Sequence, residues 1–138
     1  MRPTKSWVYA PPAPPKSKIP DEVKARVQAE ADHLIDAFKQ RYVKPPPDDW
    51  RFNYITDLST KWHRSYLYLC ATFACPGPNA LSPTFEAPFT RLEYAGWDRF
   101  NLAYMRHTGK WQEVYPGLPL DDAMAVIRDE ALFHPPGW

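Results

Sequence analysis

The chain has 138 residues, of which 44% are hydrophobic and 15% are aromatic, and its formal net charge is +1. A chain of this length forms one domain that buries about two-thirds of its unfolded surface, so it needs neither a disulfide framework nor a structural metal. The nearly neutral charge excludes an overall field that would attract polyanions. The 17 prolines predict long irregular segments around a packed core.

The first 20 residues differ from the rest in charge and in proline content. They hold no acidic residue and four basic ones, which gives +4: Arg2, Lys5, Lys16 and Lys18. The remaining residues hold 13 basic and 16 acidic side chains, a charge of −3. We predict a proline-rich extended arm over residues 1–20 and a single domain over residues 21–138. Trp7 and Tyr9 are candidate binding residues, which dock either on this domain or in an aromatic groove of a partner.

Residues 21–41 predict a long amphipathic helix. Apolar side chains recur there at spacings of three and four residues: Val23, Val27, Ala31, Leu34, Ile35 and Phe38. The prolines from Pro45 onward prevent the helix from continuing. We expect the helix to lie across the aromatic face of a sheet, with His33 at the boundary of the apolar stripe.

Two strands are predicted next, over residues 51–58 and 62–75. The first alternates aromatic and polar side chains, and it is expected to end at residues 57–60. The second is apolar on both faces, so it is predicted to be central and covered on each side. Cys70 and Cys75 within it are expected to be reduced and structural. Beyond a loop, residues 85–89 are expected to be extended, with Pro88 at an edge or a bulge.

Residues 89–115 predict three strands joined by two glycine-bearing turns. A three-residue loop over residues 96–98 places Leu92 and Tyr94 on one face with Phe100 and Leu102. The opposite face then holds Arg91, Glu93 and Asn101, with Glu93 facing Asn101 directly and forming a cross-strand hydrogen bond.

The second turn is predicted to be a two-residue hairpin over Thr108 and Gly109, with Gly109 at a positive φ. This register places Trp111 opposite Arg106 on the aromatic face, and Glu113 opposite Tyr104. We then expect a mutual contact of three side chains, in which the guanidinium of Arg106 stacks on Trp111 and pairs with the carboxylate of Glu113.

The C-terminal part resembles a known family. The strings FTRLEY, DRFNLAYMRHTGKW and LPLDDAMAVIRDEALFHP are similar to those of small bacterial proteins described only as a domain of unknown function. The resemblance is strongest over the C-terminal third, and the earlier strings RFNYITD and FACPGPNALSPTFE extend it. It supports the fold boundaries and implies no activity, cofactor or site residue.

The last predicted element is a helix of about ten residues that ends at Glu130 and is capped by Asp121. Its inward side chains are Met124, Ile127 and Ala131, and Phe133 is expected to anchor the extended end of the chain. The predicted fold class is therefore α+β. An antiparallel sheet of about five strands, with a meander-like C-terminal half, packs against one long N-terminal and one short C-terminal helix.

No catalytic motif is found in the sequence. The histidines His33, His63, His107 and His134 lie on four different elements without the spacing of metal ligands, so we expect neither a metal nor a cofactor. A small enzyme built around His63 or His107, with a nearby cysteine as nucleophile, is the weakest alternative.

The leading hypothesis is a non-catalytic protein-binding or adaptor module of a bacterial cytoplasm, which holds a protein partner or a second copy of itself. The arm and the second sheet face would bind this partner. The alternative is a nucleic-acid-associated accessory protein, in which the lysines of the arm and the turn residues Arg106, His107 and Lys110 contact phosphates. No apolar stretch is long enough to span a bilayer, so no membrane association is expected.

Overall fold

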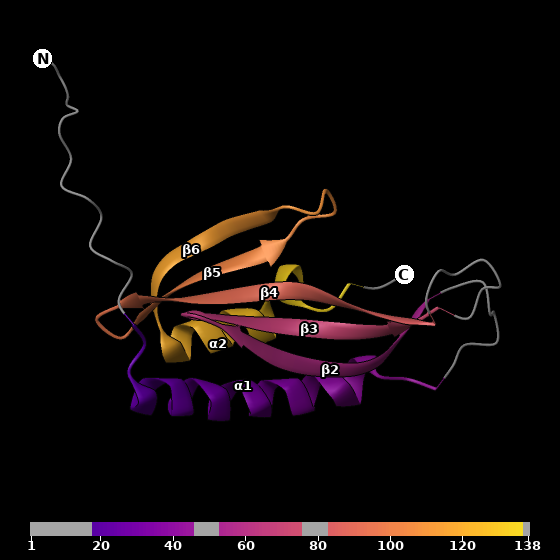
Figure 1. Cartoon of the computed structure of the whole chain (residues 1–138), viewed down its shortest axis with the longest axis horizontal. Helices are drawn as coiled ribbons and strands as arrows, with labels where there is room; N and C mark the ends of the chain where they lie inside the picture. The colour runs from indigo at the N-terminus through magenta and orange to yellow at the C-terminus, as the bar shows by residue number, and fades with distance from the viewer. Residues whose placement is uncertain (1–17, 46–52, 76–82, 137–138) are drawn as a thin grey trace, which may run out of the picture.

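The computed structural model describes residues 18–45, 53–75 and 83–136. This part of the chain forms two α-helices, one short 3₁₀ helix and a five-stranded sheet: α1 (Asp21–Tyr42), β2 (Tyr54–His63), β3 (Tyr66–Ala74), β4 (Thr84–Gly96), β5 (Arg99–Met105), β6 (Trp111–Pro119), α2 (Leu120–Asp129) and η1 (Ala131–Phe133). The strand order is β2-β3-β4-β5-β6, and neighbouring strands are antiparallel. The predicted α+β fold is confirmed (Figure 1).

Helix α1 has the predicted length and the predicted buried face. Its buried side chains are Val27, Ala31, Leu34, Ile35 and Phe38, whereas His33 is exposed. The helix begins after Pro20 and ends before Val43, whose backbone is extended. It packs along β2 and contacts α2, and it lies along the bottom of the molecule in Figure 1. No helix within the described ranges is long and apolar enough to span a membrane.

Strands β2 and β3 form a hairpin that differs from the prediction. Residues 57–60 continue β2 instead of ending it, and Trp62 and His63 belong to β2. The strand pair turns over Arg64 and Ser65, and Arg64 adopts a φ of 55°. Neither residue is glycine, proline or asparagine, so serine is the only sequence signal of a tight turn here, and it is a weak one.

Strand β4 is longer than predicted because the extended segment near Phe85 continues without a break to Gly96. Its pairing with β3 shifts where Leu69 faces Thr90 and Cys70 faces Pro88. Pro88 therefore lies at a bulge, as predicted. A bulge accommodates proline because the residue there has no ladder hydrogen bond to donate.

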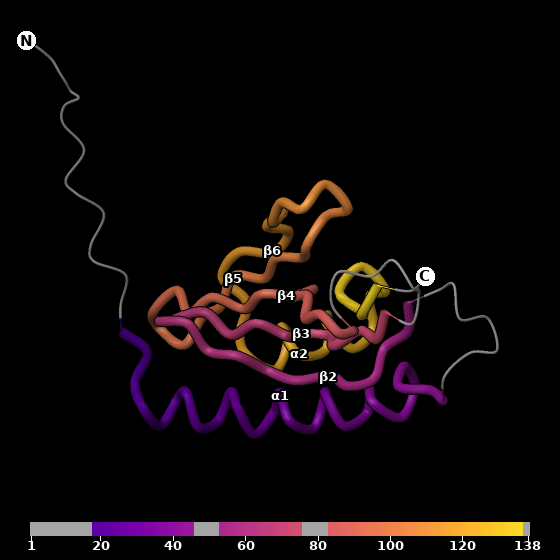
Figure 2. The backbone as a smooth tube through the Cα atoms, turned by 45° about the vertical axis from the view of Figure 1, so that its right-hand side comes forward, coloured from indigo at the N-terminus to yellow at the C-terminus, as the bar shows by residue number. Residues whose placement is uncertain are grey.

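The helices cover one face of the sheet. The buried side chains of β3 that face this layer are Leu67, Leu69, Ala71 and Phe73. Tyr66 and Tyr68 alternate with them, face the other side and are only half-buried. Both helices pack on the same side of β3 (Figure 2), and the second cover predicted for this strand lies outside the described residues. We call the side that carries Tyr66 and Tyr68 the open face.

The C-terminal helix α2 buries Leu120, Ala123, Met124 and Ile127. Asp121 is not its cap, because the helix starts at Leu120 after Pro119, and no side chain caps it. Ala131 is exposed, contrary to the prediction, because the chain leaves the α-helix at Glu130 and changes to a 3₁₀ turn. Phe133 anchors this segment as predicted. It is 0% exposed, and its carbonyl accepts a hydrogen bond of 2.8 Å from the hydroxyl of Thr90.

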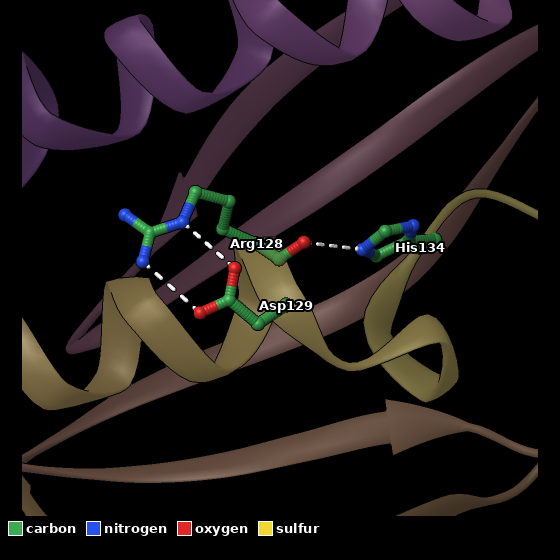
Figure 3. A network of polar contacts seen from close by, with 3 residues as sticks. All are labelled: Arg128, Asp129 and His134. Carbon is green, nitrogen blue, oxygen red and sulfur yellow. Dashed lines mark hydrogen bonds and ion pairs between the residues drawn. The ribbon is translucent and has the colours of Figure 1, made fainter.

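A polar network fixes the end of the described chain (Figure 3). The guanidinium of Arg128 donates to the carboxylate of Asp129 at 2.9 and 3.0 Å, and Nε2 of His134 donates to the carbonyl of Arg128 at 2.8 Å. Since Nε2 carries the proton, Nδ1 accepts from the hydroxyl of Tyr42 on α1. This histidine therefore joins the C-terminal segment to both helices.

Candidate functional site

The turn between β4 and β5 produces the predicted strand pairing, but with a shorter loop than the predicted three residues. Leu92 faces Leu102 and Tyr94 faces Phe100, as predicted. The connection is a two-residue turn over Trp97 and Asp98, with φ values of 55° and 58°, preceded by an irregularity between Tyr94 and Gly96. Positive φ at both central residues is the geometry that matches the twist of two strands in a hairpin.

The turn between β5 and β6 contradicts the predicted register. The backbone N–H of Arg106 donates to the carbonyl of Lys110, and the N–H of Gly109 donates to the carbonyl of Arg106, both at 2.9 Å. The loop therefore has three residues, and Gly109 adopts the left-handed conformation at its end, with φ at 81°.

One extra loop residue moves Trp111 to the other side of the sheet. Trp111 pairs with Met105 instead of Arg106, and Glu113 pairs with Ala103 instead of Tyr104. A shift of one residue exchanges the faces of a strand. The predicted mutual contact of Arg106, Trp111 and Glu113 is therefore wrong, and Trp111 lies on the open face.

On the open face, four side chains from three strands form what we call the aromatic–arginine cluster: Tyr66 and Tyr68 of β3, Arg91 of β4 and Trp111 of β6. The Cζ atom of Arg91 lies 5.1 Å from the ring centres of both Tyr66 and Trp111. The rings of Tyr68 and Trp111 are 5.7 Å apart, and those of Tyr66 and Tyr68 are 6.0 Å apart. These distances are within the range of cation–π and aromatic contacts.

The cluster borders a polar pair that the sequence predicted. Nδ2 of Asn101 donates to Oε1 of Glu93 at 3.3 Å across β4 and β5. Oδ1 of the same amide accepts from the backbone N–H of Gly117 at 2.9 Å. Asn101 thus links β4 to the irregular end of β6, and the predicted pair of Glu93 and Asn101 is confirmed.

The charged side chains of the open face nearly balance. By register this face carries three cations, Lys61, Arg91 and Arg99, and four carboxylates, those of Asp57, Glu86, Glu93 and Glu113, which gives a net charge of −1. Lys61 and Glu86 form an ion pair of 2.7 Å. Cys70 lies on the same face and is buried, and this burial raises the pKa of its thiol to about 11. At neutral pH the thiol is protonated and is a poor nucleophile.

A family model described as a domain of unknown function (DUF3024) matches residues 19–135. The chain belongs to this family. The match includes every helix and strand of the structure, and therefore the aromatic–arginine cluster. No match was found among curated proteins or among solved structures.

In this member of DUF3024, the structure brings together three of the predicted site residues. Arg91, Glu93 and Asn101 lie side by side on the open face. The other predicted residues in the described ranges are exposed at the tip of the β5–β6 hairpin: Arg106, His107 and Lys110. The candidates Trp7 and Tyr9 lie outside the described residues.

The cluster partners of Arg91 were not predicted as site residues. Tyr66 and Tyr68 alternate with the core residues of β3, and the pairing of β3 with β4 brings them to Arg91. Trp111 was assigned to the wrong face. His63 lies at the turn end of β2 and His107 in the β5–β6 turn, which are opposite ends of the sheet, so the structure does not bring these two histidines together.

Proposed function

We propose that this protein is a non-catalytic binding module that holds a protein partner on the open face of its sheet, through the aromatic–arginine cluster. The observation that supports this proposal is the stacking of Arg91 between Tyr66 and Trp111 on a face that neither helix covers. Tyrosine, tryptophan and arginine are the residues that contribute most often to binding energy at protein interfaces.

The preorganisation of Arg91 favours this role. Its guanidinium lies against two rings, so binding would cost little of the side-chain entropy that a free arginine loses. Its donors remain suited to a carboxylate or a backbone carbonyl of the partner. The three ring residues of the cluster are half-buried, so each has more apolar surface for a partner to cover.

The charge of the open face favours a protein over a nucleic acid. Single-stranded nucleic acids bind to aromatic platforms in basic grooves. Here the face carries a net charge of −1, and the cations of Arg106 and Lys110 are confined to one turn. A protein surface that presents basic side chains around an acidic or polar centre complements this face.

The test uses affinity capture with the tagged protein from a lysate of its native cells, followed by a measured dissociation constant for the recovered partner. The variants Arg91→Ala and Tyr68→Ala remove contacts of the cluster. Leu132→Ala is the matched control because Leu132 is a large, exposed apolar residue outside the cluster. We expect each cluster variant to weaken binding about tenfold and the control to bind like the wild type.

Three outcomes are distinguishable. Equal binding by the cluster variants and the wild type would contradict the proposed face. Recovery that disappears after nuclease treatment and falls steeply with added salt would assign the nucleic-acid alternative instead. Removal of residues 1–17, with the candidates Trp7 and Tyr9, keeps the buried Ile19 of the domain and shows whether the arm adds to the contact. A partner retained with unchanged affinity would restrict the binding site to the domain.

A further inference from the structure

A second site lies where the start of α1 meets the β2–β3 turn. An open cleft of about 860 Å³ is lined by residues just before and within the first turn of α1, by Trp62 and His63 at the end of β2, and by the turn residues Arg64 and Ser65. Both segments lie at the same end of the molecule, on the left in Figure 1. The volume is in the range of small-molecule sites.

The cleft is basic, unlike the open face. Lys18, Lys24 and Arg64 line it together with a single acid, Asp21, which gives a net charge of +2. Within the described residues, none of the three cations forms an ion pair. The cleft therefore gathers three cations that form no ion pair within the described chain, and only Asp21 offsets their charge there.

One of these cations is held in place. The ammonium of Lys24 lies 5.0 Å from the centre of the Trp62 ring. The indole is itself fixed, because its Nε1 donates to Oε1 of Gln28 at 2.7 Å. A cation that is positioned before binding loses less entropy when it contacts an anion.

The cleft also offers neutral donors for an anion. No side chain caps the N-terminus of the 22-residue helix α1, so its first N–H groups are free to donate, and the acids Asp21 and Glu22 of the first turn already complement the helix dipole. Ser65 lines the cleft and is 8% exposed, and its hydroxyl has no hydrogen-bond partner among the described residues. A buried hydroxyl without a partner is costly unless a ligand or water supplies one.

We propose that this cleft binds the phosphate group of a phosphorylated small molecule. Lys24 and Arg64 contact the phosphate oxygens as charged donors, and the Ser65 hydroxyl and the first amides of α1 donate to the same group. The space beyond the phosphate admits the rest of a monoester. Tyr66 lines the cleft and also belongs to the aromatic–arginine cluster. The phosphate contacts come from other residues, so this proposal does not depend on the partner-binding role.

The test is a titration of the ¹⁵N-labelled full-length protein with inorganic phosphate and with glycerol 3-phosphate, at ionic strength held constant with sodium chloride. We expect saturable shifts of the amide signals of residues 21–24 and 63–66. Lys24→Gln and Arg64→Gln should each weaken binding about tenfold, and Ser65→Ala should weaken it less, since a neutral donor is removed. Arg106→Gln is the matched control, because Arg106 is exposed at the opposite end of the sheet.

Two results would overturn the proposal. The first is the absence of saturable shifts near the cleft with both probes. The second is an equal loss of affinity in Arg106→Gln and Arg64→Gln, which would mean diffuse attraction by surface charge. The amide spectra of the variants verify that each one is folded, so a loss of binding cannot be attributed to unfolding. Neither result would affect the test of the open face, which uses other residues and another ligand.

Discussion

Arg91 and Trp111 lie against each other across an intervening strand, with 5.1 Å between the Cζ atom of Arg91 and the centre of the indole ring. Arg91 belongs to β4 and Trp111 to β6, and β5 between them carries Ala103 directly opposite Arg91. Ala103 is only 2% exposed although it faces the open side. Its small side chain leaves room for the two larger ones to meet above it.

The contact between Arg91 and Trp111 should be measurable as a coupling energy. We expect Arg91→Ala and Trp111→Ala to destabilise the protein by less in combination than the sum of their separate effects, with a coupling of about 0.5–1 kcal/mol. Urea unfolding of the wild type, the two single variants and the double variant gives this value. Strict additivity of the two substitutions would show that the contact adds nothing to stability.

The buried hydroxyl of Thr90 is expected to be important for stability. Thr90 is 0% exposed, and its hydroxyl donates to the carbonyl of Phe133 at 2.8 Å. Thr90→Val keeps the shape and leaves that carbonyl without its donor, which should cost about 1–3 kcal/mol of unfolding free energy. Thr72→Val is the control, because Thr72 lies on the open face of β3 and is only half-buried. It should change the free energy of unfolding by less than about 0.5 kcal/mol. Similar values for the two valine variants would contradict this role of Thr90.

The loop before Trp111 depends on Gly109. Its φ is 81°, and no atom lies within 4 Å of the position that an added Cβ would occupy. Gly109→Ala should therefore destabilise the protein only through its backbone conformation, by about 1 kcal/mol. Asparagine tolerates this conformation better, so Gly109→Asn should lose less. Chemical denaturation of the two variants tests the order, and a Gly109→Ala variant as stable as the wild type would exclude the left-handed turn.

The two cysteines should differ in reactivity. Burial raises the pKa of Cys70 to about 11, so at pH 8 only on the order of 0.1% of this thiol is thiolate. Cys75 is free and only half-buried. Ellman's reagent at pH 8 should modify Cys75 in the native protein and reach Cys70 only after denaturant is added. Mass spectrometry of the native adduct identifies the site, and prompt modification of Cys70 would disprove its protection.

Local patterns in the sequence were sufficient for the elements whose signals are strong and continuous. The apolar spacing and the following prolines predicted α1, because a helix buries one stripe whatever it packs against. Pro88 predicted an edge or a bulge, since proline has no backbone N–H to donate, and the structure has a bulge there. The pairing of Glu93 with Asn101 followed from the alternation of side chains in β4 and β5. Since Leu92 and Phe100 must share the buried face, Glu93 and Asn101 share the other one.

Only the tertiary structure decided where the turns lie and which side chains meet on the open face. The β2–β3 turn over Arg64 and Ser65 has no glycine, proline or asparagine to mark it, and the β5–β6 loop has three residues where two were predicted. The third loop residue determines on which face of the sheet Trp111 lies, and therefore whether it contacts Arg91. Side chains from β3, β4 and β6 come together only through pairing over long sequence separations, and such pairing is a property of the whole sheet, which the local sequence does not encode.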